Sequence, residues 1–200
     1  MKKEQGVRYL SYPQAVFVVC SYDYQKRPNL MTVALGGMCS HNPPLLFVSI
    51  KKTRYTHRNI TERRAFTVNV PSSDHVAQVD YVGLVSGRTA DKYAVCGLTA
   101  VPSDAVDAPF IEEFPTHAEC VLYDAIELGS HTMFIGEIKK IMGDEDITTD
   151  LSHMRPNANN IPDMIKARGI VYAVAGDSRC YCSLGTPLEK AYSAGRKFKA

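Results

Sequence analysis

The chain has 200 residues, of which 45% are apolar and 22% charged, so it is long enough to bury the core of one ordinary soluble domain. Lys and Arg outnumber Asp and Glu by only 23 to 21, which excludes a protein that binds a polyanion through its overall charge. The longest early apolar run, AVFVVC, is too short for a signal sequence or a membrane span, so we expect a cytoplasmic protein without a membrane segment. Six scattered cysteines predict thiols and no structural disulfide.

Runs rich in Val, Ile, Phe and Tyr recur along the chain and predict a mainly β protein. No repeat, low-complexity tract or linker interrupts them, so residues 1–200 are expected to form a single domain. The predicted strands are, in chain order, AVFVVCSY, LMTVAL, PLLFVSI, AFTVNV, HAECVLYDAIEL, HTMFIGEIKKI and GIVYAVAG. Short helices are predicted at residues 56–64, 73–84, 89–95 and 162–168. They do not alternate regularly with the strands, which argues against a doubly wound parallel sheet.

Residues 117–128 and 131–141 have the pattern of a β-hairpin joined at Gly129 and Ser130. Because side chains alternate along a strand, the first of these strands should present one apolar face to the inside of a barrel or sandwich. That face consists of Ala118, Cys120, Leu122, Ile126 and Leu128.

The stretch SIKKTRYTHRN, residues 49–59, places four cations directly after the apolar run LLFVSI. Thr56 is a suitable N-cap for the helical segment THRNITERR, so the cations lie between a strand end and a helix start. Such a point binds anions, and Ser49, Arg54 and Thr56 add donors suited to a phosphate monoester. A solvated turn is the second interpretation. A nucleic-acid surface ranks third, because the basic cluster does not extend beyond Arg63 and Arg64.

Residues 28–72 contain an ordered series of short motifs: N-x-M-T, NPPL, a strand that ends in Ser49, R-x-T and F-x-V-N. VSGRTADKY and ELGSHTMFIGEI follow further along the chain. This ordered series resembles the FMN-binding segment of the flavin reductase-like family, which includes the flavoredoxins. The resemblance covers nearly the whole chain and is weakest over residues 142–168, which we expect to form an insertion or lid.

The resemblance implies a split antiparallel β-barrel with Greek-key connectivity and short flanking helices, and this agrees with the strand pattern. It further implies a homodimer with FMN near the subunit interface. Ser49, Ile50, Lys51, Arg54 and Thr56 would hold the phosphate and ribityl chain, and Met31, Thr32, Val33 and Ala34 would line the isoalloxazine ring. Arg88 and Lys92 would reach the same flavin, and Asn29 and Tyr55 complete the predicted cofactor-binding set.

One departure from the family pattern concerns the ring. Many relatives carry an aromatic residue shortly after the N-x-x-T element, where this chain has Leu35, Gly36 and Gly37. The glycines either let a second planar molecule approach the ring or serve a tight turn or bulge.

The resemblance implies an FMN-dependent, flavin reductase-like enzyme that passes hydride or electrons to a small acceptor or a redox protein. NAD(P)H is one candidate for the donor, which the sequence does not specify. Because flavin reacts at its own ring, no catalytic side chain is predicted. The Cys and His pairs lack the spacing of a zinc site, so no metal is predicted. The alternatives are a non-enzymatic FMN electron carrier that docks with redox proteins and a flavin-binding module without turnover.

Overall fold

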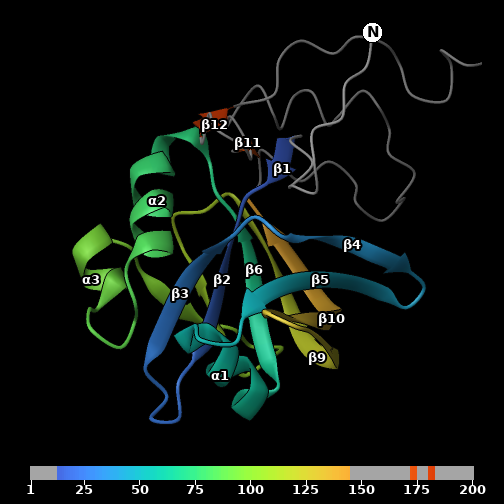
Figure 1. Ribbon diagram of the computed structural model, residues 1–200. Helices are drawn as coiled ribbons and strands as arrows, with labels where there is room; N and C mark the ends of the chain where they lie inside the picture. Colours follow the sequence, from blue (N-terminus) through green and yellow to red (C-terminus); the bar gives the residue numbers. More distant parts are fainter. Residues whose placement is uncertain (1–12, 145–171, 175–179, 183–200) are drawn as a thin grey trace, which may run out of the picture.

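The structure is a computed structural model that describes residues 13–144, 172–174 and 180–182 (Figure 1). The described part is mostly β, with a few short helices, as predicted. Its elements are β1 (Pro13–Ala15), β2 (Phe17–Tyr22), β3 (Pro28–Val33), β4 (Gly36–His41), β5 (Pro44–Lys51), α1 (Tyr55–Arg63), β6 (Ala65–Val70), the 3-10 turn η1 (Ser73–His75), α2 (Val76–Leu84), α3 (Lys92–Cys96), β7 (Ala100–Pro102), β8 (Pro109–Ile111), β9 (Thr116–Leu128), β10 (His131–Gly143), β11 (Tyr172–Val174) and β12 (Cys180–Cys182).

A seven-stranded antiparallel sheet in the order β3-β2-β6-β9-β10-β5-β4 forms the body of the protein. The sheet curls until β3 and β5 come into contact. Next to this seam, the backbone N–H of Ser49 donates to the carbonyl of Leu35 over 2.8 Å. β4 and β5 continue outward as a projecting pair of strands (Figure 1). The predicted split barrel is therefore confirmed.

The inside of the barrel is an apolar core to which every long strand except β4 contributes. Val19, Val48, Phe66 and Phe134 are buried in it. α1 crosses one end of the barrel, where Ile60 joins the same core. Because α1 carries the chain across that end, β5 and β6 are consecutive in sequence but are not neighbours in the sheet.

A second core lies outside the barrel, between β2 and β3 on one side and α2 and α3 on the other. Val18, Cys20 and Leu30 face Val79 and Val82 there. β2 is thus buried on both faces, which explains why FVVC is continuously apolar and does not alternate.

The predicted hairpin is confirmed as β9 and β10, joined at Gly129 with φ of 65°. The prediction of one continuous buried face is wrong for its last two members. A register shift leaves Tyr123 between the paired residues Leu122 and Asp124, so the alternation changes sides at this bulge. Ile126 and Leu128 therefore point outward and are 39% and 52% exposed.

The helices differ from prediction at their starts. α1 begins at Tyr55 and its N-cap is Arg54, so Thr56 is not the N-cap and instead lies in the first turn. The segment predicted at 73–84 is one 3-10 turn followed by α2. The one predicted at 89–95 is helical only from Lys92, where Asp91 caps α3 by accepting from the N–H of Ala94. Among the described helices, none is long and apolar enough to cross a membrane.

Three sequence expectations fall wholly or partly outside the described residues. The helix predicted at 162–168 lies outside them, as do residues 145–168 of the predicted insertion. Residues 142 and 143, the start of that insertion, belong to the end of β10. Of the strand predicted over GIVYAVAG, the described part is β11, which pairs with β1 and β12.

Candidate functional site

A cavity of about 400 Å³ lies where the start of β3, the start of α1 and the turn before α3 meet (Figure 1). Four predicted cofactor-binding residues line it, namely Asn29, Tyr55, Arg88 and Lys92. The remaining lining residues are Asp23, Arg27, Pro28, Leu30, Gly87, Thr89, Ala90 and Asp91. This volume falls within the range of small-molecule sites, roughly 300 to 1,000 Å³. The cavity is thus large enough for part of an organic ligand.

Lys92 supplies a buried positive charge to the cavity. It is 4% exposed, and its Nζ donates to the carbonyl of Val82 at the end of α2 over 2.9 Å. Burial lowers the pKa of Lys92 to about 8; the Cys20 thiol raises it and the Arg54 guanidinium lowers it by smaller amounts. An ammonium with three donors in such a place favours an anion, which would restore its charged form.

Asn29 supplies the opposite kind of group, an unused acceptor. Its Nδ2 donates to Thr56 Oγ1 over 2.8 Å, which ties β3 to the first turn of α1. Its Oδ1 is buried and has no hydrogen-bond partner among the described residues. Because Thr56 accepts in this bond, its own hydroxyl proton is available to another acceptor, such as a phosphate oxygen.

Tyr55 and Arg88 form the wall between the cavity and the loop before α1. The Tyr55 hydroxyl donates to Asp23 Oδ2 over 2.9 Å, and Arg27 Nε donates to the same oxygen over 2.7 Å. Burial raises the pKa of Asp23, but hydrogen bonds from Arg27, Tyr55 and Gln25 outweigh this effect and lower it overall. Asp23 therefore stays ionised and fixes the position of the Tyr55 ring.

The first turn of α1 adds an uncompensated helix N-terminus beside the cavity. No side chain caps the helix there, and its first turn contains no acidic residue. The positive end of the helix dipole is therefore available to an anion. Arg54 is the N-cap residue of α1 and so adds a cationic side chain at this end of the helix.

The residues predicted to line the ring lie further along and directly after β3, and those on β5 were predicted to hold the phosphate and ribityl chain; neither group lines the cavity. Val33 and Ile50 are buried in the barrel core, so their side chains face away from any ligand on the outer surface. Ser49 and Lys51 alternate with buried neighbours on β5 and point outward. Met31 packs against the barrel core, and Thr32 Oγ1 donates to the carbonyl of Val79. Ala34, directly after β3, is half-buried.

Of the eight lining residues that were not predicted from the sequence, Asp23, Arg27 and Gly87 bear most directly on the shape of the site. Asp23 and Arg27 lie four apart in the turn after a buried strand, a spacing compatible with the ion pair they form. Gly87 belongs to the S-G-x-x-x-D-K loop, but nothing local indicates what its missing side chain makes room for. A Cβ there would lie 2.0 Å from Asn29 Oδ1.

The two glycines that replace the expected aromatic residue have different surroundings. A Cβ on Gly36 would lie 2.9 Å from the carbonyl oxygen of Phe47 and 3.2 Å from the ring of Phe17. Gly36 is therefore required for close strand packing, whereas a Cβ on Gly37 would meet only the Phe47 ring, at 3.7 Å. Gly37 lines a separate apolar cavity of about 200 Å³, together with Phe17 and Met38.

The donor and acceptor set of the first cavity fits the phosphate end of a flavin mononucleotide. Lys92, Arg88 and the N-terminus of α1 suit a phosphate group. The unpartnered Asn29 Oδ1 requires a donor, and the ribityl hydroxyls are donors. The ionised phosphate group of FMN has no donor of its own, so the ribityl hydroxyls would supply the one that Oδ1 needs.

A split barrel with a cavity lined by Lys92 and Arg88 beside its first hairpin is the arrangement expected of the flavin-binding oxidoreductases. The chain belongs to the flavin reductase-like family, since the family model described as "Flavin reductase like domain" matches residues 9–162.

Solved structures agree with this assignment. The flavoredoxin of Desulfovibrio vulgaris (Miyazaki F) is 43% identical, with a TM-score of 0.86 over 98% of this chain and 100% of that one. The flavoredoxin from Methanosarcina acetivorans is 26% identical, with a TM-score of 0.83 over 100% and 98%. An uncharacterised protein of Archaeoglobus fulgidus is 36% identical over 127 residues, which cover 64% of this chain and 71% of that protein.

Proposed function

We propose that the cavity holds the phosphate and ribityl end of FMN and that the protein is an FMN-dependent, flavin reductase-like enzyme. The observation that carries this proposal is the pairing, in one cavity, of the buried Lys92 ammonium with the unpartnered Asn29 Oδ1. Together they call for a ligand that is both anionic and rich in hydroxyl donors. The likeness to flavoredoxins, at 43% identity in one case, supports FMN as that ligand.

In this arrangement Lys92, Arg88 and Arg54 would hold the phosphate with the N-terminus of α1. Ala34, Ser49 and the backbone of Ile50 would be left to hold the isoalloxazine ring. When bound, FMN supplies hydride or one-electron chemistry at its ring. The tasks of this chain are to bind and orient the flavin and to present its ring to donor and acceptor.

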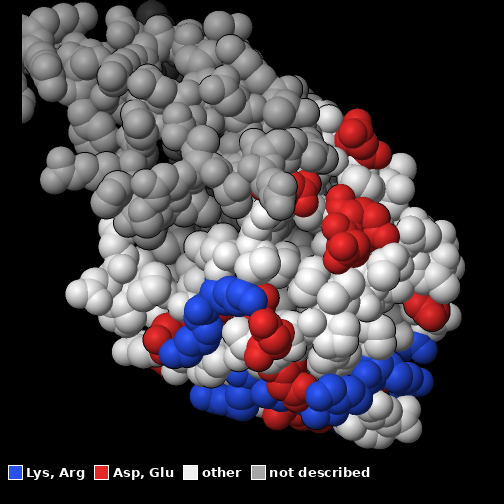
Figure 2. All heavy atoms as spheres, turned by 180° about the vertical axis from the view of Figure 1, so that it is seen from behind, with Lys and Arg blue, Asp and Glu red and all other residues white. Residues whose placement is uncertain are grey.

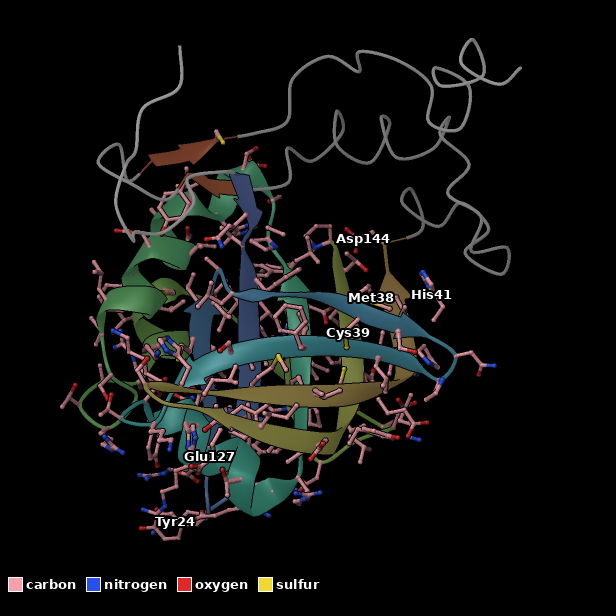
Figure 3. All side chains as sticks on the ribbon, turned by 45° about the vertical axis from the view of Figure 1, so that its right-hand side comes forward. Tyr24, Met38, Cys39, His41, Glu127 and Asp144 are labelled. Carbon is pink, nitrogen blue, oxygen red and sulfur yellow. The ribbon has the colours of Figure 1, made fainter. Side chains whose placement is uncertain are left out.

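We further propose that the enzyme is a homodimer through the outer face of β9, β10 and β5. Ile126, Leu128 and Met133 lie side by side on that face, and Ser49 is paired with Met133. A second copy would cover the exposed Ile126 and Leu128 and lie next to the ring position. Leu128→Lys should shift the mass measured by light scattering from dimer to monomer, while Tyr24→Lys, at an exposed position near α1 (Figure 3), should not.

A non-enzymatic electron carrier is the second candidate, and the charge distribution favours it in one respect. Basic side chains gather along the lower edge of the face in Figure 2, with acidic side chains among them. Lys51, Lys52 and Arg58 are exposed in and beside the start of α1, where Lys52 pairs with Glu127 and Arg58 with Glu62. Such an edge suits an acidic redox protein as donor or acceptor.

Anaerobic mixing of the FMN-loaded protein with NADH, NADPH and a reduced ferredoxin in turn separates the two candidates. The enzyme hypothesis expects a nicotinamide to bleach the flavin absorbance and to sustain turnover with a small acceptor. Bleaching by the reduced protein alone would instead establish a carrier. A purified protein that is colourless and does not bind added FMN would refute both.

A further inference from the structure

The turn formed by residues 86–89 makes one wall of the cavity. It joins the end of α2 to the approach to α3, and Gly87, Arg88 and Thr89 line the cavity. Two hydrogen bonds shape it: Thr89 N–H donates to the carbonyl of Ser86 over 3.1 Å, and Arg88 N–H donates to Ser86 Oγ over 3.3 Å. The turn is therefore a compact unit that can move as one piece.

Gly87 brings this turn directly onto Asn29. A Cβ at position 87 would lie 2.0 Å from Asn29 Oδ1 and 3.2 Å from Cδ1 of Tyr55. Only glycine allows such an approach, and the approach is what shields Oδ1. The closed turn thus covers a strong acceptor without offering it an N–H or O–H donor, which is unfavourable for a buried carbonyl oxygen.

Contacts of one exposed side chain hold the turn in this position. Arg88 Nη1 donates to the carbonyl of Thr53 over 3.2 Å, and its guanidinium lies 5.4 Å from the centre of the Tyr55 ring. Both contacts reach across the cavity to the start of α1. Contacts of an exposed cation are weak in water. Because these contacts are weak and closure leaves an acceptor unsatisfied, the closed position of the turn is only slightly more stable than an open one.

We propose that residues 86–89 form a lid that closes on Asn29 through Gly87 and is opened by a phosphorylated polyol. The phosphate takes Arg88 from the carbonyl of Thr53, and a hydroxyl of the polyol donates to Asn29 Oδ1 in place of the contact with Gly87. This inference rests on the proposed function, because the ribityl phosphate of FMN is such a group. A free sugar phosphate has the same chemistry.

Association kinetics test the lid. FMN fluorescence is followed after rapid mixing with ligand-free protein. For the unaltered chain the observed rate should level off at high FMN concentration, because the opening of the lid is a first-order step that then limits the rate. In Gly87→Ala the new methyl group prevents closure of the lid, so the observed association rate should rise linearly with FMN concentration. At low FMN concentration this rate should be about fivefold higher than in the unaltered chain, because the contacts removed are worth about one hydrogen bond.

Two arginine variants form a matched pair for the contacts of Arg88. Arg88→Gln removes a charge and also releases the lid, so association should become faster. Arg27→Gln removes a charge from the same cavity but leaves the lid contacts intact, so association should become slower. Equal slowing of association in the two arginine variants would overturn the lid. So would a linear concentration dependence in the unaltered chain combined with no faster association in Gly87→Ala. Circular dichroism is the control that each variant is folded.

Calorimetric titration tests the role of Asn29. Ribitol 5-phosphate should bind about tenfold more tightly than pentyl phosphate, which lacks the hydroxyls, since one hydrogen bond contributes a factor of about 10 at most. This preference should disappear in Asn29→Leu and persist in Thr56→Val, which removes the partner of Nδ2 but keeps Oδ1. Loss of the preference in both variants, or its absence in the unaltered chain, would refute the role of Asn29.

The ligands also separate this inference from the proposed function. If ribitol 5-phosphate binds with the expected preference but FMN does not bind, the hydroxyl contact with Asn29 stands and the flavin function falls. If FMN binds and the two phosphates bind equally, the flavin function stands and the hydroxyl contact falls. If inorganic phosphate binds as tightly as both, the cavity recognises only an anion and the inference fails.

Discussion

Two clusters of buried polar side chains differ in how their hydrogen bonds are used. At the cavity, Asn29 Oδ1 has no partner among the described residues, and the Lys92 ammonium donates to the carbonyl of Val82. Beneath β8, His117 Nε2 lies 3.3 Å from Glu119 Oε1, and Ser103 Oγ donates to Oε2 of the same carboxylate.

Among the described residues, the cluster beneath β8 has no unpartnered buried side-chain atom, although His117 also lines the apolar cavity of about 200 Å³. Ser103 Oγ accepts from the N–H groups of Ala105 and Val106, at 3.1 and 3.0 Å. The His117 ring stacks on Phe110 with the ring centres 4.0 Å apart. Both clusters contain buried ionisable groups, so burial alone does not distinguish a binding site from a structural network. The unused hydrogen-bonding capacity beside a cavity makes that distinction.

The largest expected effect is on ligand affinity at the cavity. Lys92→Met keeps the length of the side chain and removes its charge, so FMN affinity should fall by about ten- to a hundredfold, the value of a charged hydrogen bond. The free energy of unfolding of the ligand-free protein should not fall, because a poorly satisfied buried ammonium is removed. Fluorescence titration and urea unfolding measure the two quantities. Unchanged FMN affinity would remove Lys92 from the site.

The opposite result is expected beneath β8. Glu119→Ala leaves His117 and Ser103 without their shared partner, so the free energy of unfolding should fall by about 1 to 3 kcal/mol. Glu119→Gln keeps most of the hydrogen bonds and should lose less. FMN affinity should be the same in both variants once they are folded. A clear loss of FMN affinity in Glu119→Gln would contradict the purely structural role.

The pH dependence of Lys92 should separate stability from binding. Its pKa is lowered by burial from 10.5 to about 8, so between these values the unfolded chain binds more protons than the folded one. The free energy of unfolding of the ligand-free protein should therefore rise from pH 8 towards 10.5, while FMN affinity, which needs the ammonium, should fall. Lys92→Met should flatten both curves, which distinguishes Lys92 from the nearby Cys20, Cys96 and Tyr93. A slope that persists in this variant would assign the effect to those groups.

The smallest effect concerns His117 at acid pH. Burial lowers its pKa below 6.5, against the raising effect of Glu119, so the folded protein keeps the ring neutral where the unfolded chain is already protonated. Stability should be fully present above pH 6.5 and be lost as pH falls through the lowered pKa. Urea midpoints between pH 7 and 5 should decline less in His117→Gln. An equal decline would assign the effect to other groups, such as His57, whose pKa burial also lowers.

Most of the barrel was predictable from local pattern. The alternation along β5, β9 and β10 and the turn at Gly129 arise from neighbouring residues, so they can be read without knowing the fold. The reversal of sides after Leu122 could not be predicted, because a bulge depends on how two strands pair. The predicted start of α1 was wrong for a similar reason, because Thr56 bonds to Asn29, 27 residues away, and does not cap its own helix.

For the candidate site, local sequence was enough to predict which segments carry suitable side chains: the basic loop, the helix start after β5 and the ordered motifs of the family. Which of these segments lie together in space depends on the tertiary structure. It brought Asn29, Tyr55, Arg88 and Lys92 to one cavity and placed Ile50 and Val33 in the core. Curling of the sheet and packing of α2 and α3 set these distances, and no local sequence pattern contains them. The contact of Gly87 with Asn29 likewise exists only because residues 58 positions apart are packed together.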